Sequence, residues 1–300
     1  MIKSPDIMPD SVKIPVPFTV IGGFLGAGKT TLLNHLLTQS SGIRFAVLVN
    51  DFGDLNIDES LISSHDGQTI SLANGCVCCS ISNDFNQTVI NLVKRIEEFD
   101  QVVVEASGVS EPDRIMDIAR LDPELSPSGI VVLVDAEEIQ KHASNSYVRS
   151  VVVKQLQTAE LLIVNKTDLV NDDKLAKLHA WLEDLSPNAA RVNTSEGVIP
   201  LQMIFGYKLQ SNVFRKKADS ERNETEETIS THHNHQFKSL VFNSSKKLDR
   251  KTFEVWCEAL PPSVIRGKGI LYFEEEPEKL FVWQKVGKSF SIKKFLGASS

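Results

Sequence analysis

The chain has 300 residues, of which 41% are hydrophobic and 24% are charged, the proportions of an ordinary globular protein. The formal net charge of −7 argues against a surface for nucleic acid, and no apolar run approaches the roughly 18 residues that span a bilayer. The first segment, MIKSPDIMPDSVKIPVPF, is broken by prolines and acidic residues and lacks the apolar core of a signal peptide. We therefore expect a cytoplasmic protein that works without nucleic acid or a membrane.

Short apolar runs alternate with amphipathic stretches over the first two-thirds of the chain. The runs are rich in Val, Ile and Leu, which is typical of strands buried on both faces of a sheet. The order of strands and helices predicts an α/β domain with a mostly parallel sheet wrapped by helices. The expected strands are Phe18–Ile21, Phe45–Val49, Val102–Val104, Ile130–Val134 and Leu161–Val164, and the expected helices are Thr30–Thr38, Asn83–Phe99, Pro112–Leu121 and Asp172–Leu185.

The composition changes after about Tyr207. Residues 215–236 are almost wholly polar and cannot bury enough apolar surface to offset the entropy of ordering them, so we expect a linker or long loop. From Phe237 the pattern predicts a small α+β module that leans on the first domain because it is too small for a confident core of its own. Its expected elements are a strand at Lys238–Asn243, a helix at Arg250–Leu260, and strands around Lys268–Glu274 and Leu280–Lys285.

The predicted organisation has three parts: a nucleotide-binding domain over residues 1–207, a polar linker that contains histidines over 208–236, and the α+β domain over 237–300.

The stretch VIGGFLGAGKTTLLNHLL contains the spacing Gly23-x4-Gly28-Lys29-Thr30 between an apolar strand and an apolar helix, which is the context of a P-loop. In a P-loop, backbone N–H groups wrap the phosphates. Lys29 would reach the β- and γ-phosphates, and the Thr30 hydroxyl would bind Mg²⁺. The residues expected to bind the nucleotide here are Gly23, Gly26, Ala27, Gly28, Lys29, Thr30 and Thr31.

The sequence Asn165-Lys166-x-Asp168 follows the last clear strand of the first domain and predicts that the nucleotide is GTP. The Asp168 carboxylate can accept hydrogen bonds from both N1–H and the 2-amino group of guanine, whereas adenine would leave a buried Asp168 unpaired. Lys166 can lie along the base with its aliphatic stem. Residues 192–197 could supply a second loop against the base.

The stretch VVVEASGVSEP ends a predicted strand with Glu105. A carboxylate at this point can hold Mg²⁺ through water, and Gly108 can offer its N–H to the γ-phosphate. The alternative is an ordinary strand–helix junction that is capped by Ser107 or Ser110 and has Pro112 in the first helical turn.

The stretch VNDFGDLNID also follows a predicted strand and forms an acidic loop. Asp51 is its favoured Mg²⁺ ligand, and a solvated acidic turn is the alternative. With Lys29 and Glu105, Asp51 completes the residues expected to take part in catalysis.

Three of the four cysteines, Cys76, Cys78 and Cys79, lie within four positions in LANGCVCCSI. A reducing compartment argues against a disulfide, and clustered cysteines favour metal or thiol chemistry. In an extended strand Cys76 and Cys78 face the same side and could bind one ion, which Cys79 would join only if the chain turns. Two or three thiolates leave an open position, which suits a metal that must leave, and thiolates favour Zn²⁺ or Co²⁺. A thiol–disulfide function and buried structural cysteines are the alternatives, and Cys257 is expected to be a small buried hydrophobe.

Taken in order, GGFLGAGKTTLLNHLL, VNDFGDLNID, NGCVCCS, VVVEASGVSEP and NKTDL resemble the motifs of the CobW-like P-loop GTPases, which are relatives of the UreG and HypB nickel-insertion GTPases. The resemblance covers nearly the whole chain, including RGKGILYF at 266–273 in the C-terminal module. It implies a slow GTPase that uses GTP and Mg²⁺ and delivers zinc or cobalt to a client metalloprotein whose identity stays open. It also implies that the clustered cysteines bind the metal, and that a nucleotide- or metal-dependent homodimer is possible.

Two features depart from the family pattern. Relatives usually carry Glu at the positions of Asp51 and Asp54, and the histidine tract of the linker is reduced to His232, His233 and His235. These histidines are either a solvated linker or a weak auxiliary site that gathers metal.

Two other functions stay open: a P-loop kinase or ATPase that acts on a small molecule, and a zinc store or sensor with a degenerate nucleotide site. In the favoured interpretation, GTP and Mg²⁺ order the loops 49–58 and 105–112 and tighten the thiolate site, and hydrolysis then releases the metal.

Overall fold

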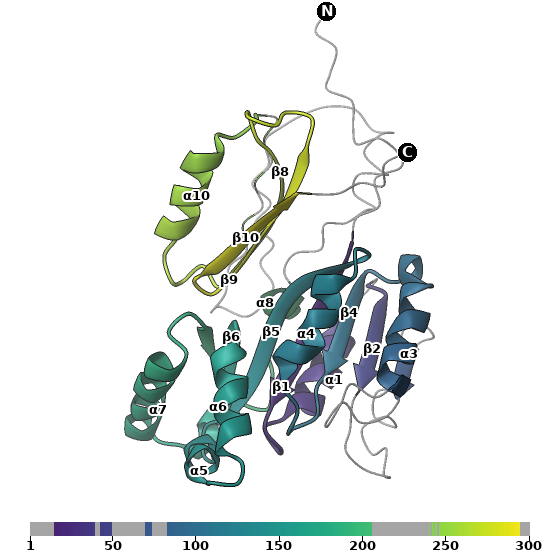
Figure 1. The fold of residues 1–300 in the computed structure, drawn as a ribbon. Coiled ribbons are helices and arrows are strands. Elements are labelled where there is room, and N and C mark those ends of the chain that lie inside the picture. The colour runs from purple at the N-terminus through teal and green to yellow at the C-terminus, as the bar shows by residue number, and fades with distance from the viewer. Residues whose placement is uncertain are drawn as a thin grey trace, which may run out of the picture.

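The computed structural model forms a larger α/β body and a smaller C-terminal unit (Figure 1). The residues that it describes are 15–39, 43–49, 70–73, 83–205, 240, 242, 244 and 246–294.

Seven of the described segments form the sheet of the larger body, in the order β3-β2-β4-β1-β5-β6-β7, and each of the recorded pairings between them is parallel. Their parallel course places the carboxyl ends of β1, β4, β5 and β6 at one edge, where open α/β sheets bind ligands. The strands are β1 (Val16–Gly23), β2 (Phe45–Val49), β3 (Ile70–Ala73), β4 (Gln101–Glu105), β5 (Leu125–Asp135), β6 (Leu161–Asn165) and β7 (Ala190–Asn193).

Helices cover both faces of this sheet, with α4 and α6 in front of it and α1 behind it in Figure 1. The helices are α1 (Lys29–Gln39), α3 (Asn83–Val93), α4 (Pro112–Leu121), α5 (Ile139–Ser144), α6 (Arg149–Thr158), α7 (Asp172–Leu185) and α8 (Leu201–Phe205).

Each face of the sheet has its own hydrophobic core. On β1, Val20 packs into the core with Ile115 of α4, whereas Ile21 packs into the other core with Leu33 of α1. Successive strand residues point to opposite faces, so a strand covered on both sides must be apolar at every position. This requirement accounts for the uninterrupted apolar runs and confirms the predicted α/β fold class.

The C-terminal unit packs α10 (Arg250–Ala259) on an antiparallel sheet of β8 (Arg266–Tyr272), β9 (Leu280–Val286) and β10 (Ser289–Lys294). Phe253 of α10 lies edge-on to Trp283 of β9, with ring centroids 5.5 Å apart. Cys257 is buried, as predicted, and its burial raises the pKa of its thiol. The small α+β module is therefore confirmed in type.

Polar contacts join this unit to the start of β5. Arg266 Nη2 and Lys268 Nζ both donate to Ser128 Oγ, over 2.8 and 2.7 Å, and Gln284 Nε2 donates to Ser126 Oγ over 3.0 Å. Burial lowers the pKa of Arg266 to about 10, although the nearby Glu160 carboxylate acts in the opposite direction. The unit thus sits at the edge of the sheet opposite to the carboxyl ends of the strands.

Several predicted boundaries need correction. The helix expected over Asn83–Phe99 ends at Val93 and is followed by a 3-10 turn, Ile96–Glu98, because the chain tightens to return into β4. The expectations did not include β3, α5, α6 or β10. Of the strand expected at Lys238–Asn243, the structure describes Leu240 and Phe242, which lie in neither helix nor strand, and the proposed domain limits at 207 and 237 fall outside the described residues.

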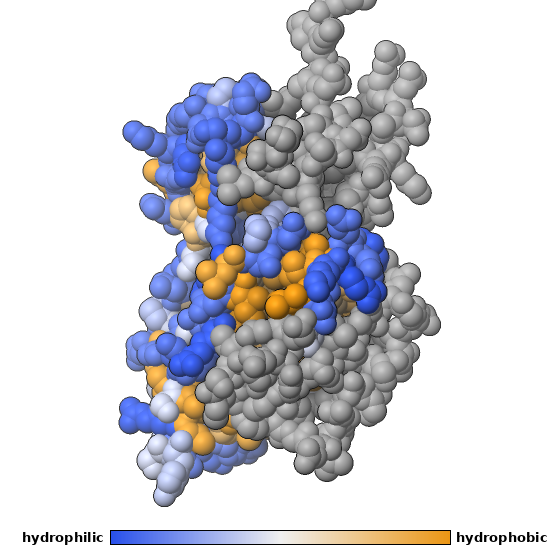
Figure 2. All heavy atoms as spheres, turned by 45° about the vertical axis from the view of Figure 1, so that its right-hand side comes forward, coloured by the Kyte–Doolittle hydropathy of each residue, from blue (hydrophilic) through white to orange (hydrophobic). Residues whose placement is uncertain are grey.

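The surface of the described part is largely hydrophilic in the view of Figure 2, with a hydrophobic area on the larger body just beneath the C-terminal unit. Within the described residues no helix has the length and apolar character that a membrane crossing requires. Among the large hydrophobic side chains that are exposed is Leu25, at 58%, in the loop between β1 and α1.

Candidate nucleotide-binding site

The glycine-rich loop leaves β1 at Gly23 and enters α1 at Lys29. Gly26 and Gly28 have φ angles of +77° and +100°, in the left-handed region that favours glycine. A Cβ atom on Gly28 would lie 2.6 Å from Asn165 Nδ2, so a side chain there would also collide with a buried amide. The loop closes on itself through Ala27 N–H, which donates to Phe24 O over 3.2 Å. The predicted P-loop therefore has the strand–loop–helix setting that phosphate binding requires.

Two residues predicted to bind Mg²⁺ meet at this loop. Thr30 Oγ1 donates to Glu105 Oε1 over 2.9 Å, although 75 residues separate the two in sequence. Glu105 ends β4, next to β1 in the sheet, and is 4% exposed. A hydroxyl and a carboxylate oxygen at a phosphate loop are the ligand types that Mg²⁺ takes, so this pair fits the ion.

The loop after Glu105 lies between the phosphate loop and α6. A Cβ atom on Gly108 would lie 2.9 Å from the backbone nitrogen of Leu25, so only glycine fits there. The N-cap of α4 is Glu111, without a side-chain capping bond, so the alternative in which Ser107 or Ser110 caps the helix is wrong. The Ser110 hydroxyl instead donates to Ser107 O over 2.8 Å, and Pro112 occupies the first helical turn as expected.

Asn165 holds two loops together instead of facing solvent. Its Nδ2 donates to Ala27 O over 2.9 Å, and its Oδ1 accepts from Gly197 N–H over 3.0 Å. The side chain is 2% exposed. One carboxamide in the NKxD segment therefore links the phosphate loop to the loop around residues 194–197.

Lys166 adopts the left-handed conformation, with φ of 60°, and its Nζ contacts Asp135 Oδ2 over 2.6 Å. Asp135 Oδ1 also accepts from the backbone N–H groups of Glu137 and Glu138. Burial by itself raises the pKa of Asp135, but these hydrogen bonds and the lysine charge lower it below its usual value. Asp168 is exposed. The burial assumed from the sequence is burial against a bound base, and it stays a prediction.

The comparisons with known proteins agree with this geometry. Residues 17–193 match the model of the CobW/HypB/UreG nucleotide-binding domain, and residues 237–299 match that of the cobalamin synthesis protein CobW C-terminal domain.

The chain belongs to the CobW/HypB/UreG family.

The chain is similar to two curated relatives and to one crystal structure over most of its length. The zinc chaperone YjiA of Escherichia coli K12 is 28% identical over 92% of this chain and 88% of its own length. The zinc-regulated GTPase metalloprotein activator 1 of Dictyostelium discoideum is 26% identical over 92% of this chain and 67% of its own length. The crystal structure of Zn(II)-bound YjiA GTPase from E. coli, at 23% identity and a TM-score of 0.52, covers 94% of this chain and 89% of that chain and shares the fold.

Three side chains at this CobW-family site were not predicted. Asp135 is the last residue of the buried strand β5, and the carboxyl end of a strand is a usual place for a functional residue in such sheets. Gln155 is a polar residue within the apolar stripe of α6, and this break in the pattern could have indicated from the sequence that the side chain has a polar partner. The ring of His142 of α5 packs against that of Phe24 of the phosphate loop, with centroids 4.5 Å apart and planes inclined by 46°, and no local pattern indicated this contact.

Several predicted ligands lie outside the described residues: Asp51, Cys76, Cys78, Cys79, His232, His233 and His235. Within the part of the chain that the structure describes, no group of three His, Cys, Asp or Glu side chains could hold a metal ion.

The two remaining predicted nucleotide ligands lie at the start of α1. Lys29 Nζ reaches Phe24 O at 3.5 Å and Thr31 is exposed in the first turn of α1.

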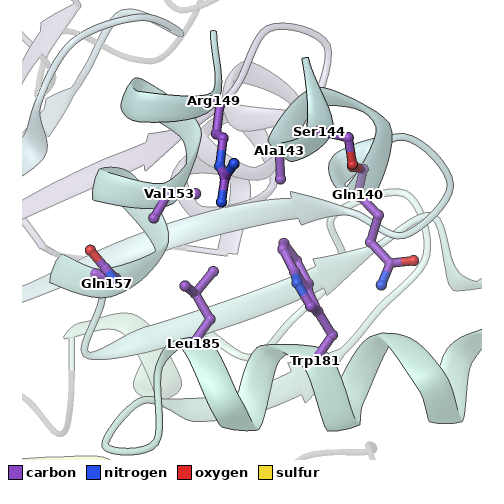
Figure 3. Close-up of a pocket in the computed structure, with 8 residues that line it drawn as sticks. All are labelled: Gln140, Ala143, Ser144, Arg149, Val153, Gln157, Trp181 and Leu185. Carbon is purple, nitrogen blue, oxygen red and sulfur yellow. The ribbon is translucent and has the colours of Figure 1, made fainter. Parts of the chain in front are cut away.

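A cleft of about 730 Å³ opens between α5, α6 and α7 (Figure 3). Trp181 and Leu185 of α7 face Val153 and Arg149 of α6 across it. Its lining residues include none of the phosphate-loop or NKxD residues, so the cleft is separate from the candidate nucleotide site.

Proposed function

We propose that this chain is a GTP-hydrolysing metallochaperone that binds a transition metal at Cys76, Cys78 and Cys79 and transfers it to a client metalloprotein. The chain is a GTPase of its family, and zinc is the favoured metal, with cobalt possible. The observation that carries the proposal is the bond from Thr30 to Glu105, which joins the phosphate loop to a second loop able to respond to the γ-phosphate. Two relatives are named as a zinc chaperone and a zinc-regulated GTPase metalloprotein activator, which supports the choice of metal and of a protein client.

The nucleotide half of the proposal uses the residues assembled at the carboxyl edge of the sheet. Lys29 and the loop amides would hold the phosphates, and Thr30 and Glu105 would hold Mg²⁺. When bound, Mg²⁺ neutralises charge on the phosphates. The exposed Asp168 carboxylate has both oxygens available for the paired N–H groups of guanine. Because no arginine or glutamine finger is evident in the sequence, we expect slow hydrolysis.

The metal half of the proposal depends on where β3 ends. β3 closes at Ala73, three residues before Cys76, and β2 lies between β3 and β4. Neighbouring strands are about 4.8 Å apart, so the end of β3 lies about 10 Å across the sheet from β4. This short separation supports a coupling in which the nucleotide state alters the thiolate site. Asp51 is proposed as a further Mg²⁺ ligand, and His232, His233 and His235 as a weak auxiliary site.

The coupling is tested by Zn²⁺ affinity. Full-length protein is loaded with Mg²⁺ and either GDP or a non-hydrolysable GTP analogue, and Zn²⁺ is titrated against a competing chelator. We expect tighter Zn²⁺ binding with the GTP analogue, and loss of that difference in Cys78→Ser. Equal affinities in the two states would refute the coupling, since a ligand without differential affinity shifts no equilibrium.

The alternatives have different outcomes in the same preparation. Preferential binding of ATP over GTP would favour a kinase or an ATPase. Zn²⁺ binding that is retained in Lys29→Ala, together with no GTP turnover by the wild-type chain, would favour a zinc store or sensor. Metal analysis under competing Zn²⁺, Co²⁺ and Ni²⁺, followed by recovery of a stoichiometric metalloprotein partner, identifies the metal and the client. Light scattering in both nucleotide states tests the possible homodimer.

A further inference from the structure

We propose that Gln155 is a positioning residue for GTP hydrolysis: its carboxamide holds the loop after Glu105 so that Gly108 N–H is set for the γ-phosphate. The inference rests on the proposed function and on the contact of Gly108 N–H with the γ-phosphate that the sequence predicts. Gln155 lies on α6 and none of the predicted motifs includes it.

The contact is a double hydrogen bond between distant segments. Gln155 Nε2 donates to Gly108 O over 3.0 Å and to Ser110 O over 2.8 Å. A primary amide nitrogen carries two protons, so both are used on this one loop. Gln155 is 1% exposed, which removes water as a competing partner.

Gln155 lies in apolar surroundings, where a polar side chain would lower the stability of the fold unless it formed these hydrogen bonds. Val152 and Leu156 of α6, and Ala159 just after it, are buried in the same core and form the apolar stripe in which Gln155 lies. A buried carboxamide without partners costs stability, and an apolar side chain would pack there without that cost. The presence of glutamine is therefore explained by what it holds, the carbonyl groups of Gly108 and Ser110.

The hydrogen bonds of Ser110 fix the peptide between Ser107 and Gly108, and Gln155 holds the carbonyl groups of Gly108 and Ser110 on the other side of the same turn. Ser107 O accepts from Ser110 N–H over 3.0 Å and from the Ser110 hydroxyl over 2.8 Å. No peptide bond in the described chain is cis, and in a trans peptide the N–H points opposite to the C=O. The Gly108 N–H is therefore directed out of the turn, while Gln155 secures the turn from the side of α6.

The opposite side of the loop is set by the phosphate loop. Gly108 lies so close to Leu25 that an added Cβ would stand 2.5 Å from its Cδ2 atom. The loop is thus held between the phosphate loop and Gln155. Donors that are in position before charge develops need no reorganisation during the reaction, which is the advantage of such an arrangement. Gln155 acts through Gly108 and does not itself touch the nucleotide.

The test compares Gln155→Leu and Gln155→Glu in the full chain. We expect kcat for GTP to fall at least about tenfold and the preference for a GTP analogue over GDP to fall about tenfold, because small misplacements of reacting groups have effects of this order. Affinity for GDP, which lacks the γ-phosphate, should stay within about twofold. The matched control is Gln157→Glu, two residues along the same helix and exposed, which should behave as wild type.

The pH dependence of Gln155→Glu separates positioning from a structural role. An ionised carboxylate cannot donate to the two carbonyl groups, and burial raises the pKa of such a group. Below that pKa the protonated acid donates one hydrogen bond, so kcat of this variant relative to wild type should rise as the pH falls. A ratio that is constant with pH, or an unchanged kcat in Gln155→Leu, would overturn the proposal.

Two further measurements keep the result interpretable. In ¹⁵N-labelled wild-type protein the Gln155 side-chain protons should exchange slowly with either nucleotide, and fast exchange in either state would also overturn the proposal, even if both variants fail to fold. Gly108→Ala tests the underlying assignment. If Gly108→Ala keeps the preference for the GTP analogue over GDP, the role assigned to Gly108 is wrong. If it loses that preference while the Gln155 variants keep it, only the positioning role of Gln155 is wrong.

Discussion

The substitution Asn165→Ala should disconnect the phosphate loop from the NKxD segment. Asn165 is 2% exposed and forms two hydrogen bonds, to Ala27 O at 2.9 Å and from Gly197 N–H at 3.0 Å. Its removal leaves two buried backbone groups without partners, each at a cost of about 1–3 kcal/mol. Water can enter the space that the side chain vacates, so we expect a loss of about 2–3 kcal/mol, near the lower end of the sum.

Urea unfolding of the nucleotide-free chain measures this loss, and GDP binding measures its effect on the site. Because Ala27 lies in the phosphate loop, the Kd for GDP should also weaken at least about tenfold, which corresponds to about 1.4 kcal/mol of binding free energy. The same substitution at Asn188, an exposed residue shortly before β7, serves as the control and should change the unfolding free energy by less than about 0.5 kcal/mol.

Asn165→Asp refines the test because it keeps an acceptor for Gly197 N–H but sets a buried carboxylate oxygen against Ala27 O in place of the donor. At neutral pH it should therefore be no more stable than Asn165→Ala and should bind GDP at least as weakly. An Asn165→Ala protein within about 0.5 kcal/mol of wild type, with unchanged GDP affinity, would refute the bridging role.

Three further predictions concern the same edge of the sheet. Glu105→Gln keeps an acceptor for Thr30 but removes the charge, so the Mg²⁺ concentration for half-maximal GTP turnover should rise at least about tenfold, which a Mg²⁺ titration measures against wild type. Gly28→Ala adds a Cβ 2.6 Å from a buried amide nitrogen at φ +100°, so nucleotide binding should be lost in a fluorescent-GDP assay, and retained binding would contradict the loop geometry. Asp135→Asn weakens the contact with Lys166. Since the folded-state pKa of Asp135 lies below its ordinary value, the wild-type advantage in unfolding free energy should be present at neutral pH and be lost as the pH falls through that lowered pKa. An advantage in acid titrations that does not depend on pH would contradict this assignment.

Local sequence was sufficient for much of the fold. The strand at Phe45–Val49 and the helices at Pro112–Leu121 and Asp172–Leu185 have the predicted limits. Each is a strongly patterned segment bounded by a clear signal, such as Pro112 at the start of α4. By contrast, α5 was missed because it is only six residues long, and α6 was missed because Gln155 interrupts its apolar spacing.

Within the site, the sequence by itself determined which residues form the phosphate loop and the NKxD segment, since both motifs are contiguous and their backbone geometry is local. Only the tertiary structure decided that Thr30 meets Glu105, that Asn165 reaches Ala27, and that Gln155 holds the loop at Gly108. Their partners are 75, 138 and 47 residues away. Such meetings depend on the strand order β4-β1-β5-β6, because the parallel crossovers bring the ends of these strands together at one edge.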